Sequence, residues 1–334
     1  MVDRSSTGSR PARIWRGHPN RGQPKADRTA SNLSIEYSPD ASGKLPERAF
    51  FKYNMNGRDR VAVRRHCAAV REALFYDEIN RGLDDPIGPE AYDIGGDYDD
   101  GVAYLIIEDI ADDHYLVDKA DVDSPWGGWA PFETVPAERF VETTRRLARF
   151  QAAWWNHARI TEPDLSSSTG DMLSVPMTGT ETFVEKTLTD EWEDNIVEGL
   201  EKRGEPDPSA SRETMRAAIE AWPDIWKDRA SQGNLSLMHV DMHLRNVLFR
   251  KTDDRPILID WEGLTTRLGI IDIAHLIATS MLSPDYLSRL DGLLVPAYHE
   301  ALIEGGVTGY SLEDCERDYR LAWLALRRDL MNTR

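Results

Sequence analysis

Cysteine and long apolar runs are scarce in this chain of 334 residues, and its net charge is negative. Its two cysteines, Cys67 and Cys315, exclude a disulfide framework, and we expect both to be packed thiols in a reducing compartment. No apolar stretch approaches the roughly 18 residues that span a membrane, and no apolar segment follows the basic N-terminus as in a secretory signal. We therefore expect a cytoplasmic protein without a membrane span.

The formal net charge is −18, which argues against general binding to nucleic acid, because such binding needs basic groups on phosphates. An acidic protein is better suited to a cationic small molecule. Two acid-rich runs, residues 108–123 and 190–194, are candidate walls of an acceptor site, and an ordinary solvated face is the alternative for both.

Length and composition predict two cores. A chain of 334 residues with 40% hydrophobic content can bury a small sheet-rich lobe and a larger helical one. Residues 1–27 differ from the rest, since they combine arginines with Ser, Gly and Pro and lack apolar periodicity. We expect them to form a flexible basic arm.

The most informative segment is a loop followed by a hairpin. His239, Asp241 and Asn246 lie within one polar stretch, and Asp260 and Glu262 follow the apolar residues 256–259. Phosphoryl transfer needs a carboxylate that accepts the proton of a hydroxyl, and oxygen ligands that hold Mg²⁺. This spacing therefore predicts that His239 opens a catalytic loop, Asp241 accepts the proton, and Asn246 and Asp260 hold metal.

A second group lies upstream. Residues 48–53 alternate as a strand that contains Lys52, and residues 61–80 have helical apolar spacing with Glu72 on another face. In a kinase the lysine reaches the nucleotide phosphates and a glutamate orients it. Glu72 is the expected partner of Lys52, Glu78 is a competing one, and a solvated helix charge is the alternative.

The residues of this loop also fit two roles outside a kinase. An aspartate between two apolar segments, such as Asp260, is commonly a turn or cap residue. His239 and His243 flank Asp241, and imidazole with carboxylate binds zinc, which would indicate a metallohydrolase. That site needs a further ligand, and the sequence supplies no obvious one.

The segments 239–246 and 260–262 resemble the H-x-D-x-x-x-x-N and Asp-Trp-Glu motifs of the aminoglycoside phosphotransferase and choline kinase group, and are most similar to its ecdysteroid-kinase-like branch. Residues 267–275 are similar to the segment in which an aspartate, here Asp272, braces the catalytic loop. The resemblance implies an α+β, bilobal protein-kinase-like fold: a nucleotide-binding lobe with its hinge over residues 28–110, and a mostly helical catalytic and substrate-binding lobe over 111–334.

The same resemblance implies ATP and Mg²⁺ as cofactors, with Glu262 in the metal motif. Backbone groups near Glu108 and Ile110 would bind the adenine edge. The glycine-rich phosphate loop of protein kinases is missing, and Thr29, Ser31 and Asn32, placed before a strand at 33–37, are weak candidates to replace it, with an ordinary polar turn as the alternative. Gln151 stands where relatives commonly have His.

The sequence therefore leads to one main hypothesis and two alternatives. The main one is an ATP-dependent kinase of a hydroxylated small molecule, such as an aminoglycoside or other antibiotic, a sugar, a sterol or an amino alcohol, with direct transfer to the acceptor hydroxyl. The first alternative is a kinase-like protein that binds nucleotide but is catalytically silent. The second is a metallohydrolase that uses His239, Asp241 and His243.

Overall fold

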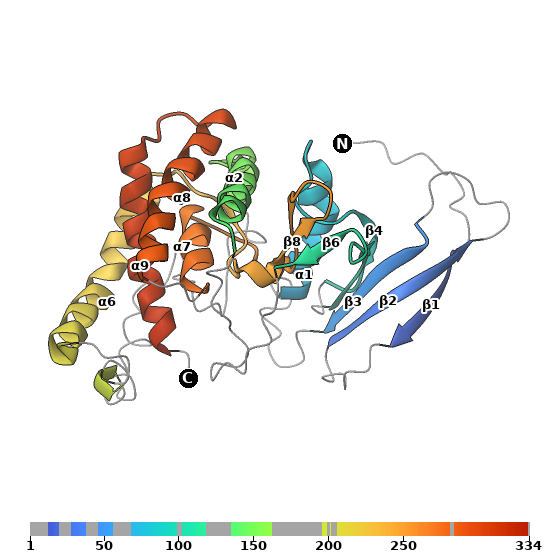
Figure 1. Cartoon of the computed structure of the whole chain (residues 1–334), viewed down its shortest axis with the longest axis horizontal. Helices are drawn as coiled ribbons and strands as arrows, with labels where there is room; N and C mark the ends of the chain where they lie inside the picture. Colours follow the sequence, from blue (N-terminus) through green and yellow to red (C-terminus); the bar gives the residue numbers. More distant parts are fainter. Residues whose placement is uncertain are drawn as a thin grey trace.

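The protein has two lobes, arranged along its long axis in Figure 1. A sheet with one helix lies at the N-terminal end, and the long helices gather at the other end. The computed structural model describes residues 13–19, 28–37, 46–55, 68–98, 102–117, 135–161, 196–198, 201, 206–280 and 284–332. This is the mixed α/β, bilobal architecture that the sequence motifs imply.

The small lobe is built on an antiparallel sheet of five strands in the order β1-β2-β3-β5-β4. Its strands are β1 (Arg13–Pro19), β2 (Arg28–Tyr37), β3 (Arg48–Met55), β4 (Ala91–Gly95) and β5 (Val102–Glu108). Apolar and polar residues alternate along β2, which places Leu33 and Ile35 on a buried face with Ala49 and Ile106. The sheet holds β3, which carries Lys52, in its centre.

One helix covers the sheet and reaches the other lobe. Helix α1 (Ala68–Leu74) continues through a π-helical turn, Phe75–Ile79, and buries Ala73, Phe75 and Tyr76. The Phe75 ring stacks on Trp261 with centroids 3.9 Å apart and planes 10° from parallel. Since Trp261 belongs to the large lobe, this stack joins the helix that carries Glu72 to the segment that carries Asp260.

Helices make up most of the large lobe (Figure 1). They are α2 (Ala137–Ala153), α6 (Pro208–Ser231), α7 (Ile270–Ala278), α8 (Pro284–Glu304) and α9 (Leu312–Asn332). Helix α7 is almost wholly buried, as its run of Ile, Ala and Leu predicts. It lies at the centre of the lobe and carries Asp272.

Short strands position the candidate catalytic loop between the lobes. Strand β7 (Ser236–Met238) pairs with β10 (Thr265–Arg267), and β8 (Val247–Arg250) pairs with β6 (His114–Leu116) and β9 (Pro256–Leu258). The segment 239–246 therefore runs from β7 to β8, and Asp260 follows the end of β9. Ladder pairing brings together segments that the sequence separates.

Two expectations about the N-terminal region are wrong. Arg13–Pro19 is not part of a flexible arm but pairs with β2 over seven residues. Strand β2 begins at Arg28 rather than 33, so Thr29, Ser31 and Asn32 lie inside a strand rather than in a loop before it. In both cases pairing with a neighbouring strand overrides a weak local β preference.

Two features singled out in the sequence, Cys67 and the acidic run 190–194, lie outside the described residues. Within the described part of the chain, none of the helices combines the length and apolarity needed to cross a membrane.

Candidate active site

The loop after β7 contains a strained residue next to Asp241. Val240 has φ +77°, a left-handed conformation that is unfavourable for a β-branched side chain and costs roughly 1–3 kcal/mol. Gly263 packs so close that a Cβ there would lie 2.8 Å from the His239 carbonyl oxygen and 2.9 Å from Val240 Cβ. The loop therefore holds a conformation that its surroundings impose.

Asp272 on α7 imposes it. Its carboxylate is fully buried and accepts hydrogen bonds from the backbone N–H groups of His239 (2.8 Å) and Val240 (2.9 Å). A third donor is the Gln151 side-chain amide, 3.1 Å away. Burial raises the pKa of Asp272 to about 7, against the two N–H donors. The geometry agrees with a bracing role for this aspartate.

His239 faces inward rather than toward a substrate. Its ring is fully buried, its Nε2 lies 2.8 Å from the Ile259 carbonyl oxygen, and its centroid lies 4.6 Å from that of Trp261. Burial lowers the pKa of His239 to about 4, so the ring is neutral and Nε2 donates to the carbonyl. His239 thus ties the loop to the segment before Asp260, and it is not placed to contact a reacting atom.

Asp241 is the exposed member of the loop. Half of its side chain is accessible, and its Oδ2 lies 3.4 Å from His243 Nε2. The hydrogen bond from His243 lowers the pKa of Asp241 to about 2. The carboxylate is consequently ionised at neutral pH and can accept a proton. From the sequence, His243 is a simple satisfied or exposed histidine, with a zinc ligand as the alternative; its hydrogen bond to Asp241 was not predicted.

Asn246 closes the loop beside Asp241. Its Nδ2 donates to the Asp241 carbonyl oxygen at 2.9 Å, and its own carbonyl accepts the N–H of Ile259 at 3.0 Å. The first bond fixes the loop between the two residues. The second holds Asn246 against the chain that leads to Asp260.

The small lobe and the metal motif meet at Lys52. Its Nζ lies 2.8 Å from a carboxylate oxygen of Glu72, 2.8 Å from one of Asp260 and 2.9 Å from one of Glu262. Strand β3, helix α1 and the turn after β9 supply these residues, which are up to 210 positions apart. The structure thus brings together four side chains that the sequence assigned to one site.

Negative charge is in excess in this cluster. Burial alone would lower the pKa of Lys52, but the three carboxylates outweigh it and raise that pKa above its usual value. Burial, with Asp260 and Glu262 nearby, raises the pKa of Glu72 to about 7, against the neighbouring ammonium. Three carboxylates around one ammonium leave an excess of negative charge, which favours a further cation.

The donor set fits Mg²⁺. One oxygen from each of Glu72, Asp260 and Glu262 lies within 4.8 Å of the others, and in the described part of the chain this is the one group of acidic, His or Cys residues with such spacing. Mg²⁺ prefers oxygen ligands, which carboxylates and the Asn246 amide supply. His239, Asp241 and His243 form no such group, so the metallohydrolase alternative gains no support.

The glutamate that pairs with Lys52 is Glu72, which is 3% exposed. The competing candidate, Glu78, instead forms an ion pair with Arg159 at 2.9 Å. The π-helical turn begins after Leu74 and changes the direction in which the later side chains point. Glu72 and Glu78 therefore have different partners.

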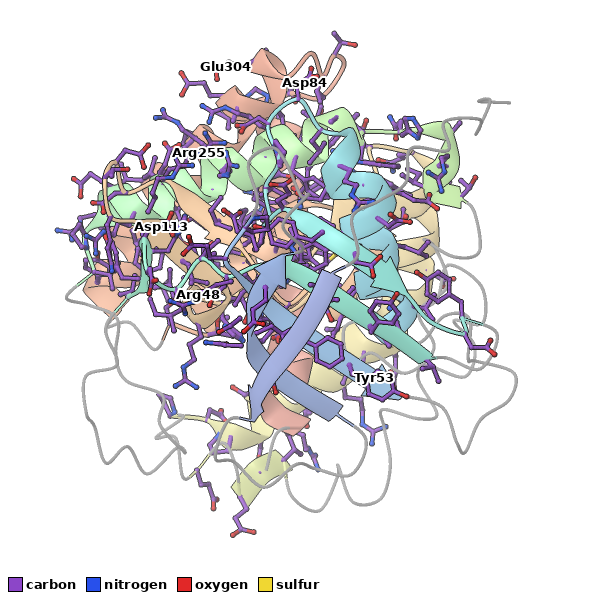
Figure 2. The ribbon with its side chains drawn as sticks, turned by 90° about the vertical axis from the view of Figure 1, so that its right-hand side faces the viewer. Arg48, Tyr53, Asp84, Asp113, Arg255 and Glu304 are labelled. Atoms are coloured by element: carbon purple, nitrogen blue, oxygen red, sulfur yellow. The ribbon has the colours of Figure 1, made fainter. Side chains whose placement is uncertain are left out.

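The expected hinge follows β5. The backbone N–H of Glu108 donates to the Glu90 carbonyl, and the Ile110 carbonyl accepts from the N–H of His114, so these two hinge groups are engaged within the protein. Arg48 on β3 binds the carboxylates of Asp109 (2.6 Å) and Asp112 (2.5 Å). In Figure 2, Arg48 and Asp113 are both labelled to the left of the strands. Arg48 thus partly neutralises the acidic run that was a candidate acceptor wall.

The three candidate phosphate-loop residues are in strand β2, next to β3. Ser31 is buried, Asn32 is exposed, and the register places Ala30 opposite Lys52. Residues 31–34 pair with β1 on one side and with β3 on the other, so ladder hydrogen bonds engage their backbone. This pairing gives Ser31 and Asn32 no support as a phosphate loop, while Thr29 pairs with β3 alone.

Sequence reasoning also missed that Gln151 and Tyr298 form a buried chain of hydrogen bonds to Asp272. The Tyr298 hydroxyl donates to Gln151 Oε1 at 2.6 Å, and Gln151 Nε2 also donates to the Gly269 carbonyl at 3.2 Å. The one hint in the sequence is that position 151 is a glutamine where relatives commonly have His.

Comparison with protein families assigns the chain to a known group of enzymes. The model of the Phosphotransferase enzyme family (APH) matches residues 129–310, more than half of the chain. The chain therefore belongs to this family and is a small-molecule kinase. The comparison with curated proteins gives no match.

Solved structures similar to this chain include a choline kinase from Streptococcus pneumoniae, with 14% identity, 89% of each chain covered and a TM-score of 0.40. An aminoglycoside phosphotransferase from Alicyclobacillus acidocaldarius has 13% identity over 95% of this chain and 92% of its own, also with a TM-score of 0.40. A choline/ethanolamine kinase family protein from Mesorhizobium loti has 15% identity over 87% of each chain and a TM-score of 0.36.

Proposed function

We propose that the protein transfers the γ-phosphoryl group of ATP to a hydroxyl of a small molecule. The acceptor is a hydroxylated compound: an aminoglycoside or other antibiotic, a sugar, a sterol or an amino alcohol. The observation that carries the proposal is the convergence of Lys52 and Glu72 from the small lobe with Asp260 and Glu262 from the large lobe. Such a cluster brings phosphate-binding and metal-binding groups to one point.

The chemistry follows from the positions of the loop residues. The acceptor hydroxyl is held against Asp241, whose ionised carboxylate takes the proton as the oxygen attacks the γ-phosphorus. A new O–P bond forms while the bond between the γ-phosphorus and the bridging oxygen breaks, and ADP leaves. Lys52 contacts the phosphate oxygens, and Glu72 orients its ammonium. Transfer is direct, without a phosphoenzyme.

Asp260, Glu262 and Asn246 are the residues proposed to hold Mg²⁺, with Glu72 at the edge of the same group. When bound, Mg²⁺ neutralises the charge that develops on phosphate oxygens. The backbone near Glu108 and Ile110 is proposed to contact the adenine, and Asp272 to hold the loop from behind.

The alternative of a catalytically silent nucleotide-binding protein predicts the same binding but no product. Nothing in the site favours it, because Asp241, Asn246 and Asp260 are all present. The two possibilities differ in one measurable outcome, which is the mass of the acceptor after incubation.

The test is incubation with ATP and Mg²⁺ across a panel of aminoglycosides, macrolides, sugars, sterols and amino alcohols, followed by mass spectrometry. The proposal predicts an acceptor heavier by one phosphoryl group, formed with one equivalent of ADP. The Asp241→Ala variant is the matched control and should leave the same acceptor unmodified. ATP binding without any product over a broad panel would favour the silent alternative.

A further inference from the structure

We propose that Gln151 and Tyr298 are positioning residues, which act through Asp272 to hold Val240 in its left-handed conformation and so aim Asp241. The inference rests on the proposed function of Asp241. It assigns a catalytic contribution to two buried side chains that contact neither nucleotide-binding nor metal-binding residues.

The proposed chain of contacts crosses three helices. Tyr298 on α8 donates to Gln151 on α2, Gln151 donates to Asp272 on α7, and Asp272 accepts the N–H groups of His239 and Val240. All three side chains are fully buried. Because water is excluded, a bond lost here is not replaced by solvent.

Three polar partners fix the orientation of the Gln151 amide: the Tyr298 hydroxyl at its oxygen, and the Asp272 carboxylate and Gly269 carbonyl at its nitrogen. Burial raises the pKa of Tyr298 well above its usual value, so the hydroxyl stays protonated and donates to Oε1. The amide nitrogen must then face Asp272 and the Gly269 carbonyl, to both of which it donates. Without that hydroxyl Oε1 would be buried with no donor, and the amide would be held only through its nitrogen.

The fit around the amide is tight enough to transmit this orientation. A Cβ at Gly269 would lie 2.4 Å from Gln151 Oε1 and 2.6 Å from the Tyr298 hydroxyl, so these groups pack directly on the backbone before α7. Ser236 in β7 also donates to the Gln151 carbonyl at 2.7 Å. Gln151 therefore touches both the helix that carries Asp272 and the strand that leads into the loop.

Asp241 needs this support because its neighbour is strained. The residue before it holds φ +77°, and the two N–H bonds to Asp272 are the contacts that stabilise the backbone at this point. An Asp272 carboxylate that rotates or shifts releases Val240, and the Asp241 carboxylate then moves relative to the acceptor. A misplacement of about 1 Å costs roughly a hundredfold in rate.

The first test compares three variants: Gln151→Met, Tyr298→Phe and the double variant. Gln151→Met keeps the length and removes the donor, and we expect kcat to fall roughly thirtyfold while the Kd for an ATP analogue changes less than twofold. Tyr298→Phe should lower kcat roughly threefold to tenfold. In the double variant the Tyr298→Phe effect should disappear, because Tyr298 acts only through Gln151.

Tyr310→Phe is the matched control for stability. Tyr310 is buried in the same lobe, and its hydroxyl donates to the Asp318 carboxylate at 3.0 Å, yet it lies outside the proposed chain of contacts. It should lose stability as Tyr298→Phe does and keep kcat. An equal fall in kcat in both tyrosine variants, or an unchanged kcat in a folded Gln151→Met, would overturn the inference.

Amide hydrogen exchange supplies a readout that needs no acceptor. Gln151→Met should increase exchange at His239 and Val240 at least tenfold more than in helix α9. If the wild type phosphorylates nothing but this local effect appears, the positioning contact stands and the proposed function fails. If the wild type is active and exchange in the loop is unchanged, the inference fails alone.

Discussion

Two groups of residues support the candidate site, the charged cluster around Lys52 and the buried contacts behind Asp241, and they differ in chemistry. Around Lys52, four charged side chains from both lobes meet at a partly exposed point, where Asp260 retains 42% of its side-chain exposure. Behind Asp241, a neutral glutamine and a tyrosine hold one buried carboxylate inside the large lobe. The first arrangement suits exchange of a charged ligand, and the second suits a fixed backbone. Binding and positioning are thus served by different chemistry.

The largest effect is expected from loss of Asp241 itself, because neither group of residues can replace its carboxylate. Asp241→Ala should lower the rate of ADP formation in the presence of acceptor by roughly 10³-fold, because it removes the proton acceptor. Nucleotide affinity should change less than twofold, since Lys52 and its partners are intact. Calorimetry with a non-hydrolysable ATP analogue checks the second point. Normal transfer by Asp241→Ala would remove the mechanism.

Asp260→Asn tests the charged cluster around Lys52. Losing one carboxylate should lower the affinity for Mn²⁺ in the presence of nucleotide roughly a hundredfold, measured by electron paramagnetic resonance. Asp254→Asn is the matched control, because Asp254 also has a positive φ, +56°, but lies on the surface turn after β8. Equal metal affinity in the two variants would exclude Asp260 as a ligand.

Gly263→Ala tests the packing on the loop. A Cβ at 2.8 Å from the His239 carbonyl forces a backbone shift, so we expect roughly tenfold lower kcat and a loss of about 1–3 kcal/mol in the free energy of unfolding. In Gly292→Ala, nothing lies within 4 Å of the new methyl group, and stability should rise by up to about 1 kcal/mol. Wild-type kcat in Gly263→Ala would show that the loop tolerates displacement.

The smallest effect is a pH dependence of stability. His239 is neutral in the folded protein down to about pH 4, while its unfolded pKa is about 6.5. The unfolded state therefore binds more protons between pH 6.5 and 4, and stability falls as pH falls. From pH 7 to pH 5 the loss due to His239 is about 2 kcal/mol. Urea unfolding of His239→Gln should show a slope shallower by that amount, and an identical slope would contradict it.

How much the sequence predicts depends on the range of the interactions. The motif residues Asp241, Asn246 and Asp260 are separated by short loops, so their spacing alone indicates a site. Alternation likewise predicts β3 closely, because residues 48–53 fall within the observed strand Arg48–Met55. These are the parts of the molecule in which local pattern and tertiary packing agree.

The rest of the fold and of the candidate site depends on tertiary contacts that leave no local pattern in the sequence. β1 and the start of β2 exist because they pair with neighbours, and no apolar alternation marks them. Spacing favours Glu72 as the partner of Lys52 but leaves Glu78 as a competitor, and the ion pairs of the two residues separate them. Gln151 and Tyr298 are 147 positions apart, so their bond is not visible in sequence.

The most direct test of the kinase mechanism is nucleotide binding, because every version of that mechanism requires it whatever the acceptor is. Wild type and Lys52→Met would be titrated calorimetrically with Mg²⁺ and a non-hydrolysable ATP analogue. We expect one site per wild-type chain and at least tenfold weaker binding in Lys52→Met, from loss of the phosphate contact. No binding by the folded wild type, or equal affinity in both proteins, would contradict the mechanism.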